Sequence, residues 1–371
     1  MDIAPFLLER WQSLHEHDVA INLSDSGAHP LTVQELLGEA GVAALGQIRL
    51  GYTQTNGTGP LRAAIAAMHP GATEANVLVT TGGIEANFLS IWKLIRPGDE
   101  VIWMQPNYGQ IGNLVESLGG VVRSWWLRPD FEAGRWIADV DELRQLVSDR
   151  TRLIVLCNPN NPTGATFDES WLLRVAEVAE QAGAWVLSDE IYIGAELTGD
   201  GRTASAWGRQ PKTLVTGSLS KAWGLPGLRL GWVVGPSGTI EDLWQHHDYT
   251  TIAPGALSDA LALHALTEPV SSQLTARARA HLRANLVLCE NWAEGHRAVI
   301  RWIRPQAGAM FWVELIDGRD TETLVHRLRQ DHSVLLVPGE HYARPGWLRI
   351  GFGGEAPELL AGLEALSKML G

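Results

Sequence analysis

Residues 218–232 read Ser218-Leu-Ser-Lys-Ala-Trp-Gly-Leu-Pro-Gly-Leu-Arg-Leu-Gly-Trp232. The apolar run before them, Thr213-Leu-Val-Thr-Gly217, predicts a buried strand, and the glycines and proline after the lysine predict a bend. Lys221 is thus preceded by two serines, Ser218 and Ser220, and followed eight residues later by Arg229. An amine can form a Schiff base with a carbonyl, while hydroxyls and a guanidinium can hold a phosphate. The stretch therefore favours a site for a phosphorylated carbonyl cofactor over a surface lysine on a polar turn.

Short β-rich runs alternate with longer helical runs from about residue 76 to residue 188. This alternation predicts a mostly parallel, doubly wound α/β sheet that is covered on both faces. Beyond Pro254 a long helical stretch, broken near Pro269, is followed by four more strands and two helices, which predict a smaller α+β domain. We expect a large domain over residues 45–255 and a small domain formed by residues 1–44 and 256–371.

Composition limits the possible partners and the compartment. The 371 residues carry 42 acidic against 29 basic side chains, a net charge of -13, which argues against nucleic acid or an anionic membrane as partner. The two cysteines, Cys157 and Cys289, lie far apart without metal-type spacing, so we expect reduced thiols in the cytoplasm and no metal. The N-terminus shows no basic region followed by a long apolar stretch, and no apolar run could span a bilayer.

Three further motifs follow predicted strands. Gly82 and Gly83, in Thr80-Thr-Gly-Gly-Ile84, would let backbone N–H groups at a helix N-terminus approach an anion. In Cys157-Asn-Pro-Asn-Asn-Pro-Thr-Gly164, two Asn-Pro dipeptides predict a defined turn at the carboxyl edge of the sheet. Asp189, at the end of a buried strand, is costly unless a cation pairs with it. Plain turns and a helix cap are the structural alternatives.

In this order the motifs resemble those of the class I/II aminotransferases among the fold-type I pyridoxal-phosphate (PLP) enzymes, over most of the chain. The resemblance implies that Lys221 forms the Schiff base and that Asp189 pairs with the pyridine nitrogen. It further implies that Asn161 and Tyr192 donate to the ring oxygen, that Tyr108 stacks on the ring, and that the phosphate is held by Gly82, Gly83, Ile84, Ser218, Ser220 and Arg229. Because Ile84 replaces the polar residue that is usual in the family, we expect the two serines and the arginine to bind more of the phosphate.

The same resemblance extends to the substrate and to a second subunit. Arg349, in Trp347-Leu-Arg-Ile-Gly-Phe352, corresponds to the arginine that clamps the substrate α-carboxylate. Tyr52 corresponds to the tyrosine that reaches the phosphate of the neighbouring subunit, which implies a homodimer. The segment over residues 21–30 is expected to line the substrate pocket through Asp25, Ser26, Gly27 and His29, with Glu9 nearby and Asn161 also contacting substrate.

The resemblance implies an aminotransferase that acts on an L-amino acid. Lys221 would hold the cofactor as an internal aldimine and then, once freed, move the Cα proton to the cofactor's C4′. Carboxylates from Asp25 and Glu9 in the pocket would suit a cationic or polyhydroxy side chain better than an acidic one. Surface or capping roles are the alternative for these two side chains and for His29.

Two other functions fit parts of the pattern. The N-terminal segment, with Asp248-Tyr-Thr-Thr-Ile252, also resembles a subgroup of capreomycidine synthase-like enzymes. These PLP-dependent lyases or cyclases eliminate a side-chain substituent from hydroxyarginine and close a ring. A non-catalytic PLP-binding sensor is the third hypothesis. Regulators of that kind carry an N-terminal DNA-binding domain, for which no room remains before Tyr52.

Overall fold

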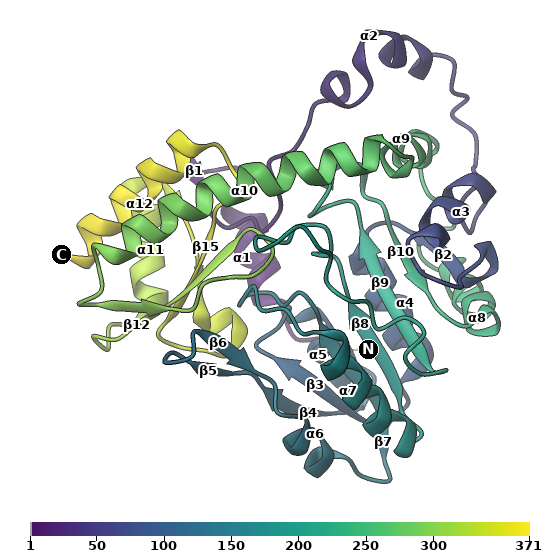
Figure 1. Cartoon of the computed structure of the whole chain (residues 1–371), viewed down its shortest axis with the longest axis horizontal. Helices are drawn as coiled ribbons and strands as arrows, with labels where there is room; N and C mark the ends of the chain where they lie inside the picture. The colour runs from purple at the N-terminus through teal and green to yellow at the C-terminus, as the bar shows by residue number, and fades with distance from the viewer. Residues whose placement is uncertain (1) are drawn as a thin grey trace.

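The computed structural model describes residues 2–371 and is built around a seven-stranded sheet with strand order β2-β10-β9-β8-β7-β3-β4 (Figure 1). Strand β10 runs antiparallel to both its neighbours, and the other adjacent pairs are parallel. The predicted α/β fold with a mostly parallel sheet is therefore confirmed. The strands are β2 (Val77–Thr80), β3 (Glu100–Gln105), β4 (Val121–Trp126), β7 (Thr151–Cys157), β8 (Trp185–Asp189), β9 (Thr213–Ser218) and β10 (Gly231–Val234).

Alternate residues of these strands enter two different apolar cores, one on each face of the sheet. On β7, Ile154 packs in one core and Val155 in the other, because successive side chains of a strand point to opposite faces. Both faces are buried, which explains the continuous apolar runs in the sequence. The helices of this part are α3 (Gly59–Ala67), α4 (Gly83–Leu94), α5 (Gln110–Ser117), α6 (Val140–Leu146), α7 (Glu169–Gln181), α8 (Ser237–His247) and α9 (Ala256–Leu266).

A second, four-stranded antiparallel sheet has the order β11-β12-β15-β14. Its strands are β11 (Ile300–Trp302), β12 (Met310–Leu315), β14 (Val337–Pro338) and β15 (Trp347–Gly351), and its helices are α10 (Val270–Glu294), α11 (Thr321–His332) and α12 (Ala356–Leu370). The N-terminal segment joins this part, because β1 (Ile21–Asn22) pairs in parallel with β13 (Val334–Leu335). The expected domain limits at residues 45 and 255 stay a prediction.

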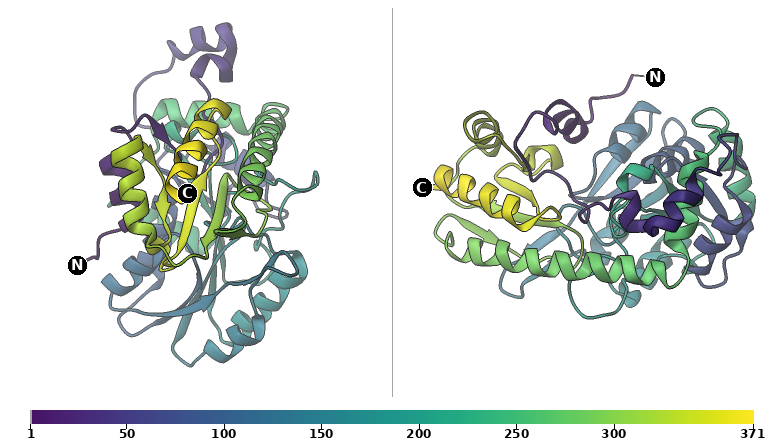
Figure 2. Two further views of the ribbon diagram at one scale, coloured as in Figure 1. Left: turned by 90° about the vertical axis from the view of Figure 1, so that its left-hand side faces the viewer. Right: turned by 90° about the horizontal axis from the view of Figure 1, so that it is seen from above.

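A short hairpin and two N-terminal helices complete the main elements of the fold. Strands β5 (Arg128–Asp130) and β6 (Arg135–Ile137) form a hairpin, and α1 (Leu7–His15) begins the described N-terminal segment. Helix α2 (Val33–Leu45) stands away from the body of the molecule (Figures 1 and 2). Within residues 2–371, none of the helices is long and apolar enough to cross a membrane.

Candidate active site

A cavity of about 400 Å³ lies where β7, β8 and β9 end and α4 begins. Ligands of open α/β sheets bind at this carboxyl edge, because polar loops and helix N-termini converge there. Most of the predicted site residues line it: Glu9, Asp25, Ser26, Gly83, Ile84, Tyr108, Asn161, Asp189, Tyr192, Ser218, Ser220, Lys221, Arg229 and Arg349.

The Gly82–Gly83 turn at the start of α4 lies against Arg229. A Cβ on Gly82 would come within 2.8 Å of Arg229 Nη2, and Gly82 has a φ of 82°, which favours glycine. Arg229 itself adopts a left-handed φ of 47°, and its Nη1 donates to the carbonyl of Pro226 at 2.9 Å. Free N–H groups at a helix N-terminus together with a guanidinium form an anion site, as the sequence predicted for the phosphate.

Asp189 is buried, only 4% exposed, and its hydrogen-bond partners are neutral. Asn87 Nδ2 donates to its Oδ2 at 3.0 Å, and the Ile191 backbone N–H donates to its Oδ1 at 3.3 Å. Burial raises the pKa of Asp189. Thr216 Oγ1 donates to Asn87 Oδ1 at 2.9 Å, so the amide is held in place. A protonated ring nitrogen would supply the cation that this carboxylate lacks.

Arg349, on β15, is 1% exposed and donates to neutral oxygens. Its Nη1 donates to Asn161 Oδ1 at 3.0 Å and to the Tyr342 hydroxyl, its Nη2 donates to the Ser24 carbonyl, and its Nε has no partner among residues 2–371. Because Asn161 Oδ1 accepts from Arg349 and from Tyr342, its Nδ2 is turned to donate elsewhere. A buried guanidinium among neutral partners suits a carboxylate ligand.

The N-terminal segment closes over the lysine. Lys221 Nζ lies 3.1 Å from Asp25 Oδ1, and this ammonium lowers the pKa of Asp25 to about 2. The hydroxyls of Ser26 and Tyr192 are hydrogen-bonded at 2.8 Å. A Cβ on Gly27 would lie 3.4 Å from Lys221 Cδ, so the segment passes directly against the lysine side chain.

Helix α1 brings two more carboxylates to the cavity. The Tyr108 hydroxyl donates to Glu9, and Phe6 packs edge-on against the Tyr108 ring at 4.5 Å. Glu16, at the end of α1, also lines the cavity and was not predicted. Glu9, Glu16 and Asp25 together make this side of the cavity acidic.

Four predicted residues do not line this cavity: Gly27, His29, Tyr52 and Gly82. His29 Nε2 pairs with Glu355 at 3.2 Å, and its place in the substrate pocket stays a prediction. The N–H of Ala28 donates to the Lys221 carbonyl, and Arg277 donates to the His29 carbonyl. Tyr52 is 90% exposed and lies away from the cavity of its own chain.

Sequence reasoning missed Asn87, Tyr342, Ser24 and Glu16. Asn87 lies four residues after Gly83, on the same face of α4 as the helix start, so helical spacing could have indicated it. Ser24 lies in the segment over residues 21–30 that was expected to line the pocket, but its own role was not predicted, and no motif marks Glu16 or Tyr342.

The donor set fits PLP. Gly82, Gly83, Ser218, Ser220 and Arg229 offer an anion cradle for its phosphate. The buried Asp189 fits a ring cation, the free Asn161 amide nitrogen fits a ring oxygen, and Lys221 fits the aldehyde.

Comparisons with known proteins agree with this chemistry. The family model of aminotransferase class I and II matches residues 18–366. Capreomycidine synthase of Streptomyces vinaceus is 34% identical over 370 residues, which cover 98% of this chain and 93% of that relative. A solved PLP-dependent aminotransferase from Streptococcus suis has a TM-score of 0.91 at 32% identity, covering 100% of this chain and 98% of that chain. The PLP-dependent cyclase OrfR has a TM-score of 0.87 at 28% identity, with coverage of 100% and 98%. This chain belongs to the aminotransferase class I and II family and is a PLP-dependent enzyme of fold type I.

Proposed function

We propose that this enzyme transfers the amino group of an L-amino acid with a cationic side chain to a keto acid. One observation carries the proposal: Lys221, Asp189 and Arg349 line a single cavity whose remaining wall holds three carboxylates. In this proposal Lys221 transfers a proton, Arg349 binds the substrate α-carboxylate, and the acidic wall binds the cationic side chain of the substrate.

Each chain residue has a defined part in this proposal. Arg349 binds the substrate α-carboxylate with help from Asn161, while Ser24 and Tyr342 hold the guanidinium in place. Lys221 would take the proton from the substrate Cα and hold it on Nζ for its return. Asp189 would pair with a protonated ring nitrogen of the cofactor, and Asn87 orients that carboxylate. The chemistry that PLP supplies when bound is an electron sink for the pair left at Cα.

The acidic wall sets the preference for the substrate side chain. Glu9, Glu16 and Asp25 face a cavity in which a negatively charged side chain would be repelled. An ammonium or guanidinium would instead form charge-assisted hydrogen bonds with them. Asp25 pairs with the free amine of Lys221 at 3.1 Å, so a bound cation would compete with that amine for this carboxylate.

We also propose a cytoplasmic homodimer in which Tyr52 reaches the phosphate site of the partner. Support comes from the exposure of this segment, since Leu50 is 81% and Tyr52 90% exposed. Large apolar side chains that are this open mark surfaces that a partner covers. The free, buried Cys157 and Cys289 support a reducing compartment.

Elimination with ring closure on hydroxyarginine is the second candidate. The 34% identity to capreomycidine synthase favours it, because that identity extends over 98% of the chain. The acidic wall would suit the guanidinium of such a substrate equally well. The two candidates differ in the fate of the nitrogen: transamination moves the α-amino group to an acceptor, whereas cyclisation retains it in the product.

Product analysis separates the two candidates. The purified holoenzyme is incubated with ¹⁵N-α-labelled arginine, lysine or aspartate plus a keto acid, and separately with ¹⁵N-α-labelled hydroxyarginine. We expect ¹⁵N in the acceptor with the cationic donors and little with aspartate. A ring product that retains ¹⁵N would instead establish cyclisation. Lys221→Ala should abolish turnover and the visible absorbance of bound cofactor, while Lys212→Ala, whose Nζ donates to the Gly183 carbonyl at 2.8 Å, should change neither.

A further inference from the structure

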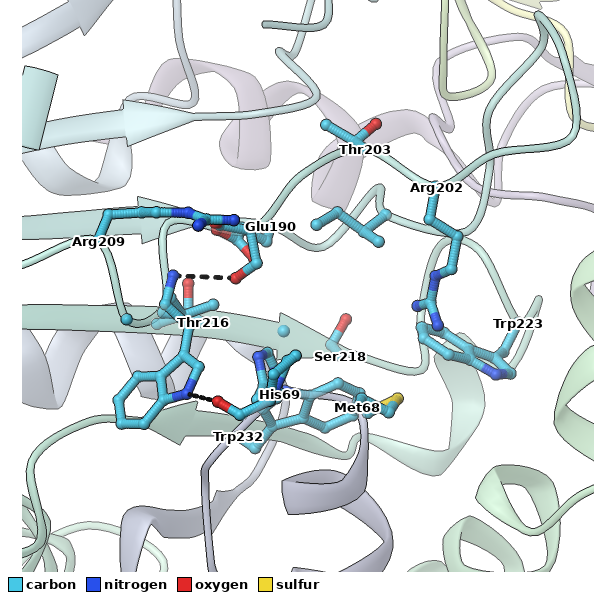
Figure 3. Close-up of a pocket in the computed structure, with 17 residues that line it drawn as sticks. Met68, His69, Glu190, Arg202, Thr203, Arg209, Thr216, Ser218, Trp223 and Trp232 are labelled. Atoms are coloured by element: carbon cyan, nitrogen blue, oxygen red, sulfur yellow. Dashed lines mark hydrogen bonds between the residues drawn. The ribbon is translucent and has the colours of Figure 1, made fainter. Parts of the chain in front are cut away.

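A second cavity of about 460 Å³ lies beside the cofactor site and plays no part in the chemistry proposed above (Figure 3). It is lined by the end of α3, by the connection from β8 to β9, and by the indoles of Trp223 and Trp232. Of the residues that line the two cavities, Ser218 at the end of β9 is common to both. The volume is in the range of small-molecule sites.

Glu190 brings a carboxylate oxygen without a partner into this cavity. Glu190 is 5% exposed; its Oε1 accepts from the Ala206 backbone N–H at 2.8 Å, and its Oε2 has no hydrogen-bond partner among the described residues. Burial raises its pKa to about 7. The Ser205 and Ser188 hydroxyls act on this carboxyl to lower its pKa, but no cation pairs with it among the described residues, and a buried carboxylate without a cation is costly.

Two more polar groups in the cavity wall lack partners. His69, which follows α3, is 8% exposed, and its Nδ1 has no partner within residues 2–371. Burial lowers the pKa of His69 to about 4, so its ring is neutral and Nδ1 can donate or accept. The buried Thr203 hydroxyl oxygen is likewise unpartnered in the described chain.

Arg202 supplies a cation to the same cavity. The carboxylates nearby in sequence are engaged elsewhere, because Glu196 pairs with Arg279 at 2.7 Å and Asp200 with Arg283 at 3.7 Å. In the part of the chain that the structure describes, Arg202 forms no ion pair within 4.0 Å, and because the residue is exposed it supplies its charge from the open side of the cavity. Figure 3 shows Glu190 and Arg202 on opposite sides of the cavity, with Thr203 above and His69 and Trp232 below.

We propose that this cavity binds a free amino acid as a zwitterion, with its ammonium at Glu190 Oε2, its carboxylate at Arg202 and its side chain against the indoles. A simple anion would leave Glu190 unmatched, and a simple cation would leave Arg202 unmatched. The indoles offer flat apolar walls that accept an aliphatic or aromatic side chain. The proposal does not depend on the reaction of the cofactor site.

Because the cofactor site also binds amino acids, the test must block it first. The holoenzyme is treated with aminooxyacetate, whose aminooxy group caps the cofactor aldehyde and whose carboxylate occupies the Arg349 clamp. Calorimetric titration with individual L-amino acids then reports binding elsewhere. We expect one additional site per chain, and an affinity at least about tenfold weaker for the N-acetyl and the amide derivative of the best ligand, since each lacks one charge.

Substitutions assign the site to this cavity. Glu190→Gln keeps the acceptor for Ala206 but removes the charge, and Arg202→Met keeps the aliphatic stem, so each should weaken binding at least about tenfold. Arg327→Met, at an exposed pair on α11, should leave it unchanged. The absorbance of the bound cofactor shows whether each variant has folded. If Glu190→Gln does not fold, the affinity of Arg202→Met for the amino acid shows whether the ligand binds in this cavity. The proposal is overturned if no amino acid binds the capped enzyme, if the N-acetyl and amide derivatives or inorganic phosphate bind as tightly, or if Arg202→Met binds normally.

Discussion

Asp189 and Glu190 are neighbours in the sequence, but their carboxylates belong to different cavities. Asp189 ends β8 and lines the cofactor site, whereas Glu190 lines the second cavity. Successive residues of an extended chain point to opposite sides, so one strand end supplies acids to two places. Burial raises the pKa of both carboxyls, but Asp189 has two donors and Glu190 has an oxygen with no partner in the described chain.

The Asn87 amide should matter for activity although no motif contains it. Asn87→Ala removes one of the two hydrogen bonds to Asp189 and leaves the Thr216 hydroxyl without its acceptor. We expect kcat to fall about tenfold, which corresponds to about 1–2 kcal/mol for a buried polar group left unpaired. Single-turnover kinetics on the holoenzyme measure it. Asn113→Ala, whose amide contacts an exposed carbonyl, is the control, and equal rates in both variants would contradict the role of Asn87.

Glu190 should make the free energy of unfolding depend on pH. Its pKa rises from 4.5 to about 7 on folding, so its contribution is complete below pH 4.5 and is lost as pH rises through 7. The loss amounts to about 3 kcal/mol. His69, with its pKa lowered to about 4, makes the free energy of unfolding rise with pH, but this contribution is the same in the wild type and in Glu190→Gln. Denaturant unfolding should therefore show the wild type losing about 3 kcal/mol relative to Glu190→Gln between pH 4.5 and about pH 8. Parallel curves would refute this pKa shift.

At the scale of the secondary-structure elements, β10 packs against the start of α4, where Gly82 and Gly83 form the proposed phosphate site. A Cβ on Gly231 would lie 2.4 Å from the Gly82 carbonyl carbon and 2.5 Å from the Gly83 nitrogen. These are backbone atoms that a side chain cannot displace without moving the helix start. The strand pairing of β10 with β2 and the helix N-terminus are thus fitted to each other, and the site depends on both.

Gly231→Ala should accordingly weaken cofactor binding more than it weakens the fold. We expect the dissociation constant of PLP to rise by about tenfold or more, because the displaced N–H groups no longer converge on the phosphate. Fluorescence titration of the apoenzyme measures it. Gly238→Ala on α8, where a Cβ meets nothing within 4 Å, should bind PLP normally. If Gly231→Ala and Gly238→Ala bound PLP with equal affinity, close packing of β10 against the start of α4 would not be needed for phosphate binding.

At the scale of the whole molecule, the exposed segment with Leu50 and Tyr52 is the surface that we expect the partner subunit to cover. If Tyr52 completes the partner's site, Lys221→Ala and Tyr52→Ala subunits should complement each other. A hybrid dimer then has one site with both wild-type residues, so mixing two impaired proteins restores activity to about a quarter of wild type for random exchange. Activity of the refolded mixture, compared with each variant alone, measures this. No gain on mixing, or a monomer in sedimentation experiments, would contradict shared sites.

The order of the motifs along the chain was sufficient to predict the α/β sheet, the family and the cofactor. Lys221, Asp189 and Asn161 each follow a buried strand, and parallel strands place their carboxyl ends at one edge, so these side chains had to meet. The prediction rested on local patterns of glycine, proline and apolar residues, which act over a few residues.

Only the tertiary structure decided which distant segments complete the site. Tyr342 and Ser24 hold Arg349, although no motif assigns either residue to the arginine. His29 pairs with Glu355 and is not among the residues that line the cavity. The second cavity arises where α3, the β8–β9 connection and two indoles meet. Such contacts join residues far apart in the sequence and depend on how the elements pack in three dimensions, which no local pattern encodes.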